Sequence, residues 1–228
     1  MVLGHKIDSA SYISFLRKKG VLVGEGVQIF RPNQTVIDVQ NPHLLSIGDY
    51  VMMTGPVTIL THDYSWSVLK RKYGYVYGKQ RRTVIGNNVF IGWGATILPG
   101  ARIGDNVVIG ANSVVGGRVD SDSVYAGNPA KKLLTLDEFF AHRQDRQFAE
   151  AADYVLAYEE RFGTEPPESE LDEYFFLFAD ADRLNPAFEV KMKLVGNYEE
   201  SMEMLRQNVR KFNSYEEFLK ACHDRRAQ

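Results

Sequence analysis

Cysteine is almost absent from this sequence, because only Cys222 occurs in 228 residues. A single cysteine excludes an intrachain disulfide and a cysteine-rich metal site. Long apolar runs are also missing, and no stretch approaches the ~20 apolar residues of a membrane-spanning helix. The N-terminal stretch MVLGHKIDSASYISFLRKKG lacks the apolar segment of a secretory signal. These absences predict a cytoplasmic protein without stable membrane insertion.

The net charge is only −2, but it is unevenly distributed along the chain. Residues 1–134 contain 15 Lys and Arg against 8 Asp and Glu, whereas residues 135–228 contain 12 against 21. The basic half suits an anionic ligand such as a nucleotide, although the two halves could equally complement each other. Without a helical recognition motif or interleaved aromatics, we expect no binding of nucleic acid.

A six-residue repeat begins at Ile85. Its blocks are IGNNVF, IGWGAT, ILPGAR, IGDNVV, IGANSV and VGGRVD, each starting with Ile or Val and most continuing with Gly. Neither the two-residue period of a strand nor the 3.6-residue period of a helix fits, so the spacing predicts a solenoid with one inward side chain per block. The same frame runs upstream through Val23, Ile29, Thr35, Asn41, Ile47, Met53 and Ile59.

Twenty residues interrupt this frame after the block ILTHDY, at 65–84, and we expect them to leave the coil as a loop. Long excursions from rigid scaffolds often carry function. The aromatic side chains of this region suit stacking on sugars or packing on another subunit. They are Tyr64, Trp66, Tyr73, Tyr75 and Tyr77. Its six cations suit either a solvated loop or a lid that attracts phosphates. They are Lys70, Arg71, Lys72, Lys79, Arg81 and Arg82.

Helical patterns flank the repeat region. Residues 1–20 are expected to be a helical segment, and residues 135–228 a helical extension that opens with a capping box at Thr135–Glu138. Within the extension, later helices are expected at about 170–181, 197–211 and 214–224. The sequence therefore predicts a mainly β solenoid domain over residues 21–134.

Histidine is the side chain best suited to remove a proton from a hydroxyl near neutral pH. Of the five histidines, only His62 lies in a coil block directly before the excursion. We therefore predict that His62 is a general base. Asp63 follows it, but neighbours on an extended segment point to opposite faces, so Asp63 is a poor candidate to orient the imidazole.

The repeat, the segment TILTHDYSW and the AGNPA turn in SVYAGNPAKKL resemble the left-handed β-helix acyltransferases, the hexapeptide-repeat family. The resemblance implies a left-handed parallel β-helix, a homotrimer with intersubunit active sites, and acetyl-CoA as acyl donor. It implies no metal. The β-helical carbonic anhydrases share the repeat, but they bind zinc through three histidines, and only His62 lies in the strong repeat.

The resemblance also assigns further residues. It implies that Asn33 and Asp38 bind the acceptor, and the aromatic composition of the excursion adds Tyr64 and Trp66 as candidates for the same contact. It implies that Trp93, Gly94, Ala111 and Gly116 line the groove for the pantetheine arm of the coenzyme, and that Lys131 and Lys132 contact its phosphates. Trp93 departs from the small residue that is usual at its position.

The segments PHLLSIGDY, THDYSW and SVLKRKYG, with the acidic extension, look most like the branch that O-acetylates cell-surface or capsular polysaccharides. We therefore expect acetyl transfer to a hydroxyl of a sugar or polysaccharide precursor. A small acceptor such as serine or a xenobiotic, and a catalytically silent scaffold, are the alternatives. The sequence leaves the acceptor, the oxyanion donor and the role of the extension open.

Overall fold

The computed structural model describes residues 4–226 and divides into two compact units, residues 1–139 and residues 140–228. Residues 1–3 of the expected N-terminal segment and 227–228 of the expected extension lie outside the described part. In that described part, no helix is both long and apolar enough to cross a membrane.

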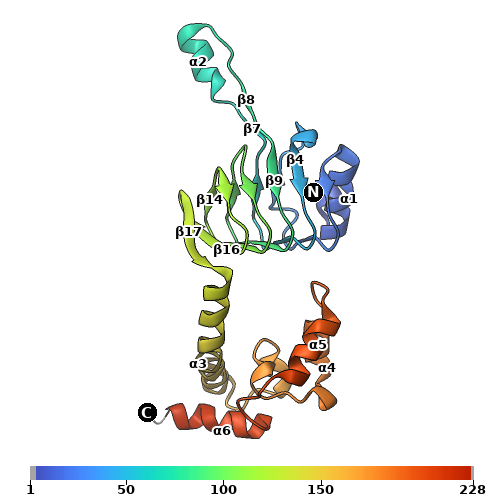
Figure 1. Ribbon diagram of the computed structural model, residues 1–228, viewed down its shortest axis with the longest axis vertical. Coiled ribbons are helices and arrows are strands. Elements are labelled where there is room, and N and C mark those ends of the chain that lie inside the picture. Colours follow the sequence, from blue (N-terminus) through green and yellow to red (C-terminus); the bar gives the residue numbers. More distant parts are fainter. Residues whose placement is uncertain (1–3, 227–228) are drawn as a thin grey trace. The chain divides into compact units, whose positions relative to one another are not determined.

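The first unit begins with a 3₁₀ turn at Gly4–Lys6, and helix α1, Ser9–Lys19, then covers one end of the solenoid (Figure 1). The Asp8 side chain accepts a hydrogen bond from Ser11 N at 2.7 Å, and Gly20 ends the helix with a φ of 98°. Such an acidic N-cap and left-handed C-cap satisfy backbone groups that helix ends leave unpaired. Tyr12 and Leu16 are buried against the first coil, so α1 shields its apolar interior from water.

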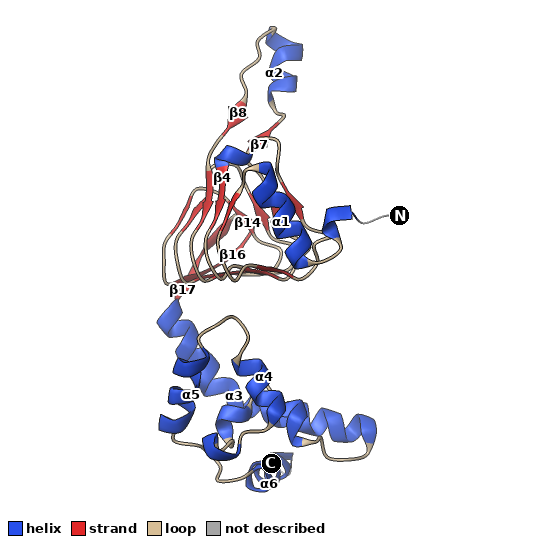
Figure 2. Cartoon of the chain, turned by 90° about the vertical axis from the view of Figure 1, so that its right-hand side faces the viewer, coloured by secondary structure: helices blue, strands red, loops and turns tan. Residues whose placement is uncertain are grey.

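Three parallel sheets form the faces of a triangular solenoid (Figure 2). The first sheet contains β1 (Leu22–Val23), β4 (Leu45–Ile47), β9 (Thr83–Ile85), β12 (Arg102–Ile103) and β15 (Arg118–Val119). The second contains β2 (Gln28–Ile29), β5 (Met52–Met53), β10 (Val89–Ile91), β13 (Val107–Ile109), β16 (Ser123–Gly127) and β17 (Ala130–Thr135). The third contains β3 (Val36–Ile37), β6 (Thr58–Ile59), β11 (Thr96–Ile97) and β14 (Val114–Val115). Only the β16–β17 pair is antiparallel within these sheets.

Strand register confirms the six-residue blocks from Ile85 to Val115, but the predicted last block is two residues too long, because Val119 pairs with Ile103. Ile85 pairs with Ile103, and Ile97 with Val115, so three blocks complete one coil. The first residue of every block is buried, as predicted, and the fifth residue is buried too. The fifth residues are Val89, Ala95, Ala101, Val107, Ser113 and Val119. The first five blocks therefore each contribute two inward side chains rather than the one we predicted, whereas Val119 is inward because it takes the place of a first residue in β15.

The upstream frame was wrong at two positions. Ile37, not Thr35, pairs with Ile59 as the first residue of its block, and Asn41 lies in a corner turn before β4. The chain adds two residues between Ile29 and Ile37 and four more before Ile47. Together these additions equal one six-residue block, so Ile47 again falls on the predicted frame. The shift between Ile29 and Ile47 therefore cannot be seen in the spacing of the flanking blocks.

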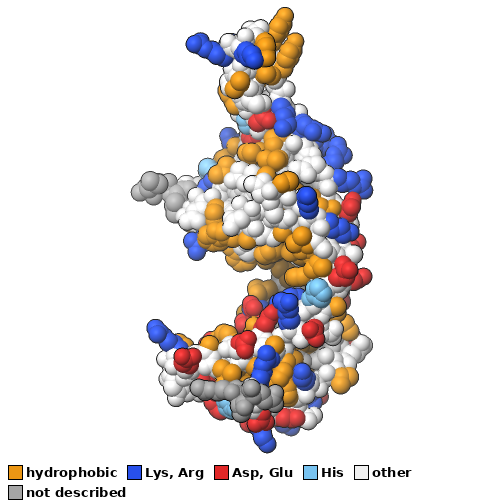
Figure 3. Space-filling model, turned by 90° about the vertical axis from the view of Figure 1, so that its left-hand side faces the viewer, with side chains coloured by type: hydrophobic (Ala, Val, Ile, Leu, Met, Phe, Trp, Pro, Cys, Tyr) orange, Lys and Arg blue, Asp and Glu red, His pale blue; other side chains and the backbone are white. Residues whose placement is uncertain are grey.

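The predicted excursion is an ordered arm rather than a plain loop. It consists of β7 (His62–Asp63), α2 (Trp66–Tyr73) and β8 (Lys79–Gln80), with β7 and β8 paired antiparallel. Its predicted end at residue 84 was wrong, because Thr83 and Val84 already belong to β9 of the solenoid. Figure 3 shows cationic and apolar side chains together on this arm.

The second unit is helical, and α3 (Leu136–Phe162) leads into it. The predicted capping box forms, since Glu138 N donates to Thr135 Oγ1 while Thr135 N donates to the Glu138 carboxylate. The single helix predicted at 170–181 was wrong, because short 3₁₀ turns occupy that stretch. The remaining helices are α4 (Pro186–Met192), α5 (Tyr198–Gln207) and α6 (Tyr215–Arg226). A separate apolar core holds this unit together, including Phe178, Phe188 and Phe218.

Truncating one inward isoleucine should destabilise the solenoid. Ile97 is fully buried in the stack, so Ile97→Ala should cost about 2–5 kcal/mol through lost burial and the cavity left behind. The outward Arg102→Ala should change stability by less than about 0.5 kcal/mol. Both tryptophans, Trp66 and Trp93, lie in this unit, so urea unfolding followed by tryptophan fluorescence measures the effect. Equal unfolding midpoints for the two variants would contradict the stacked interior.

Candidate active site

His62 lies at the corner of the solenoid where the chain leaves the third sheet for the arm. Two hydrogen bonds close the base of the arm behind it: Arg81 N donates to Thr61 O at 2.9 Å, and Thr83 Oγ1 donates to Leu60 O at 2.7 Å. The imidazole is therefore attached to a fixed corner of the coil rather than to a freely moving loop.

Asp38, at the same corner one coil earlier, holds the imidazole. Its Oδ2 lies 2.6 Å from His62 Nδ1 and also accepts hydrogen bonds from Thr61 N at 3.0 Å and Thr61 Oγ1. Its Oδ1 accepts from Gln40 N at 2.9 Å. Burial raises the pKa of Asp38, but the hydrogen bonds from Thr61, Gln40 and His62 outweigh it and lower that pKa below its ordinary value.

This geometry fixes the tautomer of the neutral imidazole. An ionised carboxylate only accepts hydrogen bonds, so His62 Nδ1 must carry the proton that it shares with Asp38. The Nε2 atom then has a lone pair, and no hydrogen bond among residues 4–226 involves it. The His62 side chain is 19% exposed and that of Asp38 only 6%, so the imidazole is accessible while the carboxylate is shielded.

Asp63 does not contact the His62 imidazole, as expected, and binds residues of the arm instead. Its carboxylate accepts from Ser65 N and Ser65 Oγ, the latter at 2.6 Å, and pairs with Lys79 Nζ at 3.2 Å. The hydrogen bonds from Ser65 lower the pKa of Asp63, with a further contribution from Lys79. Asp63 therefore joins the two strands of the arm.

The structure separates the four residues predicted to bind the acceptor. Asp38 is buried, and both of its oxygens are engaged with Gln40, Thr61 and His62, so it holds the imidazole and leaves no oxygen for an acceptor. Asn33 lies on the exposed loop between β2 and β3, at the far end of β3 from Asp38.

Tyr64 and Trp66 lie close to His62 along the chain, at the start of the arm. Their rings are 4.9 Å apart, and Tyr64 is 63% exposed. The exposed Tyr64 ring and the half-buried Trp66 ring offer an apolar surface on which a sugar ring can stack.

Most of the residues predicted to bind the coenzyme lie at another corner, between the second and third sheets. Trp93, Gly94 and Ala111 occupy successive turns there, and the Arg31 guanidinium lies 4.8 Å from the Trp93 ring centre. Gly94 has a φ of 77°, and a side chain at this position would collide with Asn112 Oδ1. Glycine is therefore required at position 94 for backbone reasons, whatever ligand lies nearby.

The β16–β17 hairpin stacks on this same corner. Gly127 N at its tip donates to Ser113 Oγ at 3.1 Å, and Lys131 and Lys132 are exposed on β17. Gly116 differs, because it follows β14 and lies at the corner between the third and first sheets. Within one chain, the structure thus places His62 and most of the predicted coenzyme residues at separate corners.

Sequence reasoning assigned Asp38 to the acceptor and missed Thr61. The signal lay in the register: Asp38 follows the inward Ile37 as Leu60 follows Ile59, and Asp38 N donates to Ile59 O at 2.9 Å. With the upstream frame displaced by two residues, this stacking could not be read from the sequence.

Comparison with known proteins places the chain in a family. Residues 82–117 match the model described as bacterial transferase hexapeptide (six repeats). Protein CapG of Staphylococcus aureus is 37% identical over 148 residues, which cover 64% of this chain and 82% of CapG. The chain belongs to the hexapeptide-repeat acyltransferase family.

Two further members of the hexapeptide-repeat acyltransferases are similar to the chain. The putative lipopolysaccharide biosynthesis O-acetyl transferase WbbJ of Escherichia coli is 54% identical over 118 residues, covering 47% of this chain and 60% of WbbJ. Among solved structures, a hexapeptide-repeat acetyltransferase of Vibrio cholerae is 25% identical with a TM-score of 0.43, covering 59% of this chain and 84% of that chain. The protein is accordingly an acyltransferase.

Proposed function

We propose that this acyltransferase moves an acetyl group from acetyl-CoA to a hydroxyl of a sugar or surface-polysaccharide precursor. The observation that carries the proposal is the buried Asp38 carboxylate, which holds His62 with Nδ1 protonated and Nε2 available. The relationship to WbbJ, whose name describes O-acetyl transfer in lipopolysaccharide biosynthesis, supports an acceptor of this class.

In the proposed reaction, His62 Nε2 takes the proton of the acceptor hydroxyl as its oxygen attacks the thioester carbonyl. The resulting imidazolium is stabilised by the ionised Asp38 at 2.6 Å. When the carbon–sulfur bond breaks, the coenzyme A thiolate leaves and takes up that proton, which returns His62 to its starting state. Transfer is direct, so no acyl group is attached to the protein.

We further propose that the exposed ring of Tyr64 and the half-buried ring of Trp66 hold the acceptor beside His62. The small residues Gly94 and Ala111, with Trp93, would line the path of the pantetheine arm, and Lys131 and Lys132 would pair with the phosphates. Gly116 would contact the coenzyme from the corner that carries His62.

A homotrimer would unite the two parts of this site. The base and most of the coenzyme residues lie at different corners of one chain, so a neighbouring copy can bring the second corner to the first. The outward side chains of the third sheet carry no charge, which suits burial between copies. They are Val36, Thr58, Thr96 and Val114. The proposal includes the left-handed coil of the family and a cytoplasmic location.

The test is acetyl-CoA turnover with a panel of acceptors, measured as release of the coenzyme A thiol. Sugars, oligosaccharides and nucleotide-linked sugars should be acetylated, whereas serine and small xenobiotics should give only background release. Cys222 is buried and burial raises the pKa of its thiol to about 12, so it should react little with the thiol reagent. Efficient turnover of serine alone, or no release with any acceptor, would contradict the proposal.

A further inference from the structure

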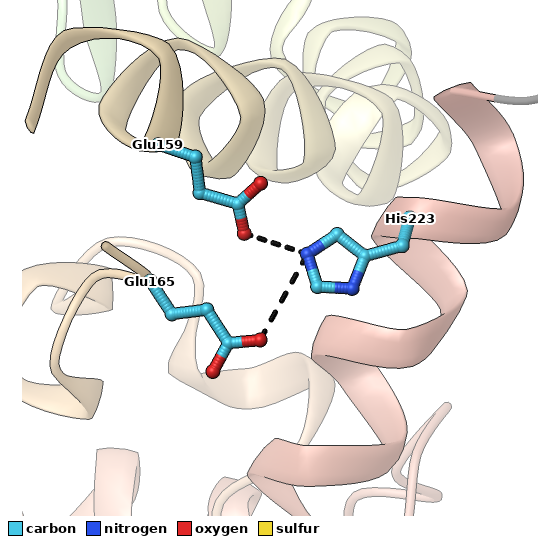
Figure 4. A group of neighbouring side chains, drawn as sticks. All are labelled: Glu159, Glu165 and His223. Carbon is cyan, nitrogen blue, oxygen red and sulfur yellow. Dashed lines mark hydrogen bonds and ion pairs between the residues drawn. The ribbon is translucent and has the colours of Figure 1, made fainter. Parts of the chain in front are cut away.

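Three side chains of the helical unit converge far from His62 in the sequence. They are Glu159 near the end of α3, Glu165 in the segment that follows, and His223 on α6 (Figure 4). His223 Nε2 lies 2.6 Å from Glu159 Oε1 and 4.0 Å from Glu165 Oε1. One potential ligand atom from each residue lies within 4.8 Å of the other two.

The charges of this cluster do not balance. A single imidazole nitrogen carries at most one proton, so His223 Nε2 cannot donate to both carboxylates. Even a protonated His223 offsets only one of the two negative charges. Within residues 4–226, Glu165 forms its only ion pair with His223, at the long distance of 4.0 Å.

We propose that Glu159, Glu165 and His223 form a binding site for a divalent transition metal, with Zn²⁺ as the best match. One imidazole nitrogen and two carboxylate oxygens suit zinc, whereas Mg²⁺ and Ca²⁺ prefer oxygen ligands throughout. Three protein ligands leave a fourth tetrahedral position for water.

Small side-chain rotations bring the ligand atoms to zinc distances. Bonds of about 2.0–2.1 Å in a tetrahedron separate ligand atoms by roughly 3.3–3.4 Å, between the two distances seen here. Glu165 would move toward His223, and its side chain is 58% exposed and free to turn. Glu159 would move slightly away as the ion takes the place of the shared proton.

The ion would fasten the last helix to the rest of the unit. Its ligands come from the end of α3, the segment after it and α6, so binding closes a contact between residues more than 50 positions apart in the chain. Because the unfolded chain does not hold these ligands together, bound Zn²⁺ should raise the melting temperature.

The test is a calorimetric titration of ZnCl₂ into the full-length protein after treatment with EDTA and dialysis. We expect saturable binding of one ion per chain and a melting temperature that rises with zinc concentration. His223→Ala and Glu165→Gln should each weaken binding at least about tenfold, since a direct ligand counts for at least as much as its outer-sphere partners. Glu165→Gln is the more conservative variant, because this exposed side chain contributes little to packing.

Matched controls separate the site from general surface binding. His142→Ala removes an exposed histidine of α3, and Glu160→Gln removes the exposed acid next to Glu159. Both should bind zinc as the wild type does. Absence of saturable binding in the wild type, or affinity that survives both His223→Ala and Glu165→Gln, would overturn the assignment.

Discussion

His62→Ala should lower kcat for acetyl transfer by about 10²–10⁴, because general base catalysis typically contributes that much. The KM for acetyl-CoA should change little, since the proposed coenzyme contacts lie mostly at another corner of the chain. Initial rates of thiol release at saturating acetyl-CoA and acceptor measure the effect. Circular dichroism of the variant should match the wild type, because the His62 side chain is partly exposed and outside the apolar core.

The matched control for this substitution is His142→Ala, which removes an exposed histidine of the helical unit. It should retain full activity. If His62→Ala also kept full activity, proton removal by this imidazole would be excluded, and the corner of the coil would need another base.

Asp38→Asn should reduce kcat by about 10²-fold or more, because the amide cannot hold His62 Nδ1–H and stabilise the imidazolium as a carboxylate does. If Asp38 acts only through His62, the double variant Asp38→Asn/His62→Ala should be no slower than His62→Ala alone. Additive losses in this cycle would contradict a shared role.

Asp63→Asn is the matched control for Asp38, since it changes a neighbouring carboxylate that pairs with Ser65 and Lys79 instead. It should leave kcat nearly unchanged. A comparable loss of kcat in both variants would show that acidic residues at the base of the arm act on its structure rather than on the imidazole.

The pKa of Asp38 also predicts how its contribution to stability varies with pH. Its pKa in the folded protein is lowered, so the ionised form stabilises the fold above the unfolded value of about 3.9. This contribution is lost as the pH falls through the folded pKa. The stability difference between wild type and Asp38→Asn should therefore be present at neutral pH and shrink in acid.

The regular part of the solenoid was predictable from sequence because its physical cause is local. Each coil must bury a side chain at a fixed interval, so Ile85, Ile91, Ile97, Ile103 and Ile109 reveal the period directly. Burial of the fifth residue was harder to predict, since small residues such as Ala95 and Ser113 do not look like a core.

The site was predictable only in part. His62 stood out because it precedes the excursion, but its relation to Asp38 depends on which residues stack across coils. Two insertions at the corners of the first coil displaced that frame and then restored it. Asn33 and Asp38 therefore looked equivalent in sequence, although they lie at opposite ends of β3.

In the second unit, helix caps allowed two helix starts to be predicted, whereas tertiary packing made one helix prediction wrong. The capping box at Thr135 marked the start of α3, and the helix predicted from residue 214 begins with a similar cap, because Glu217 N donates to Ser214 Oγ. The apolar pattern over 170–181 arises instead from aromatic residues such as Phe175 and Phe178 packing inward from short turns. Tertiary burial thus overrode the local helical pattern.

The way the arm joins the solenoid makes it a replaceable module. The coil that carries it is twenty residues longer than the next one, yet Ile47 still pairs with Ile85 and Ile59 with Ile97. The strand pairing of the solenoid therefore does not depend on the length of the arm. The reason is that β7 and β8 pair with each other and return the chain to the corner where it left the solenoid. Arms of other lengths and compositions could be exchanged here, changing what is presented to the imidazole while the prism and its Asp38–His62 pair stay as they are.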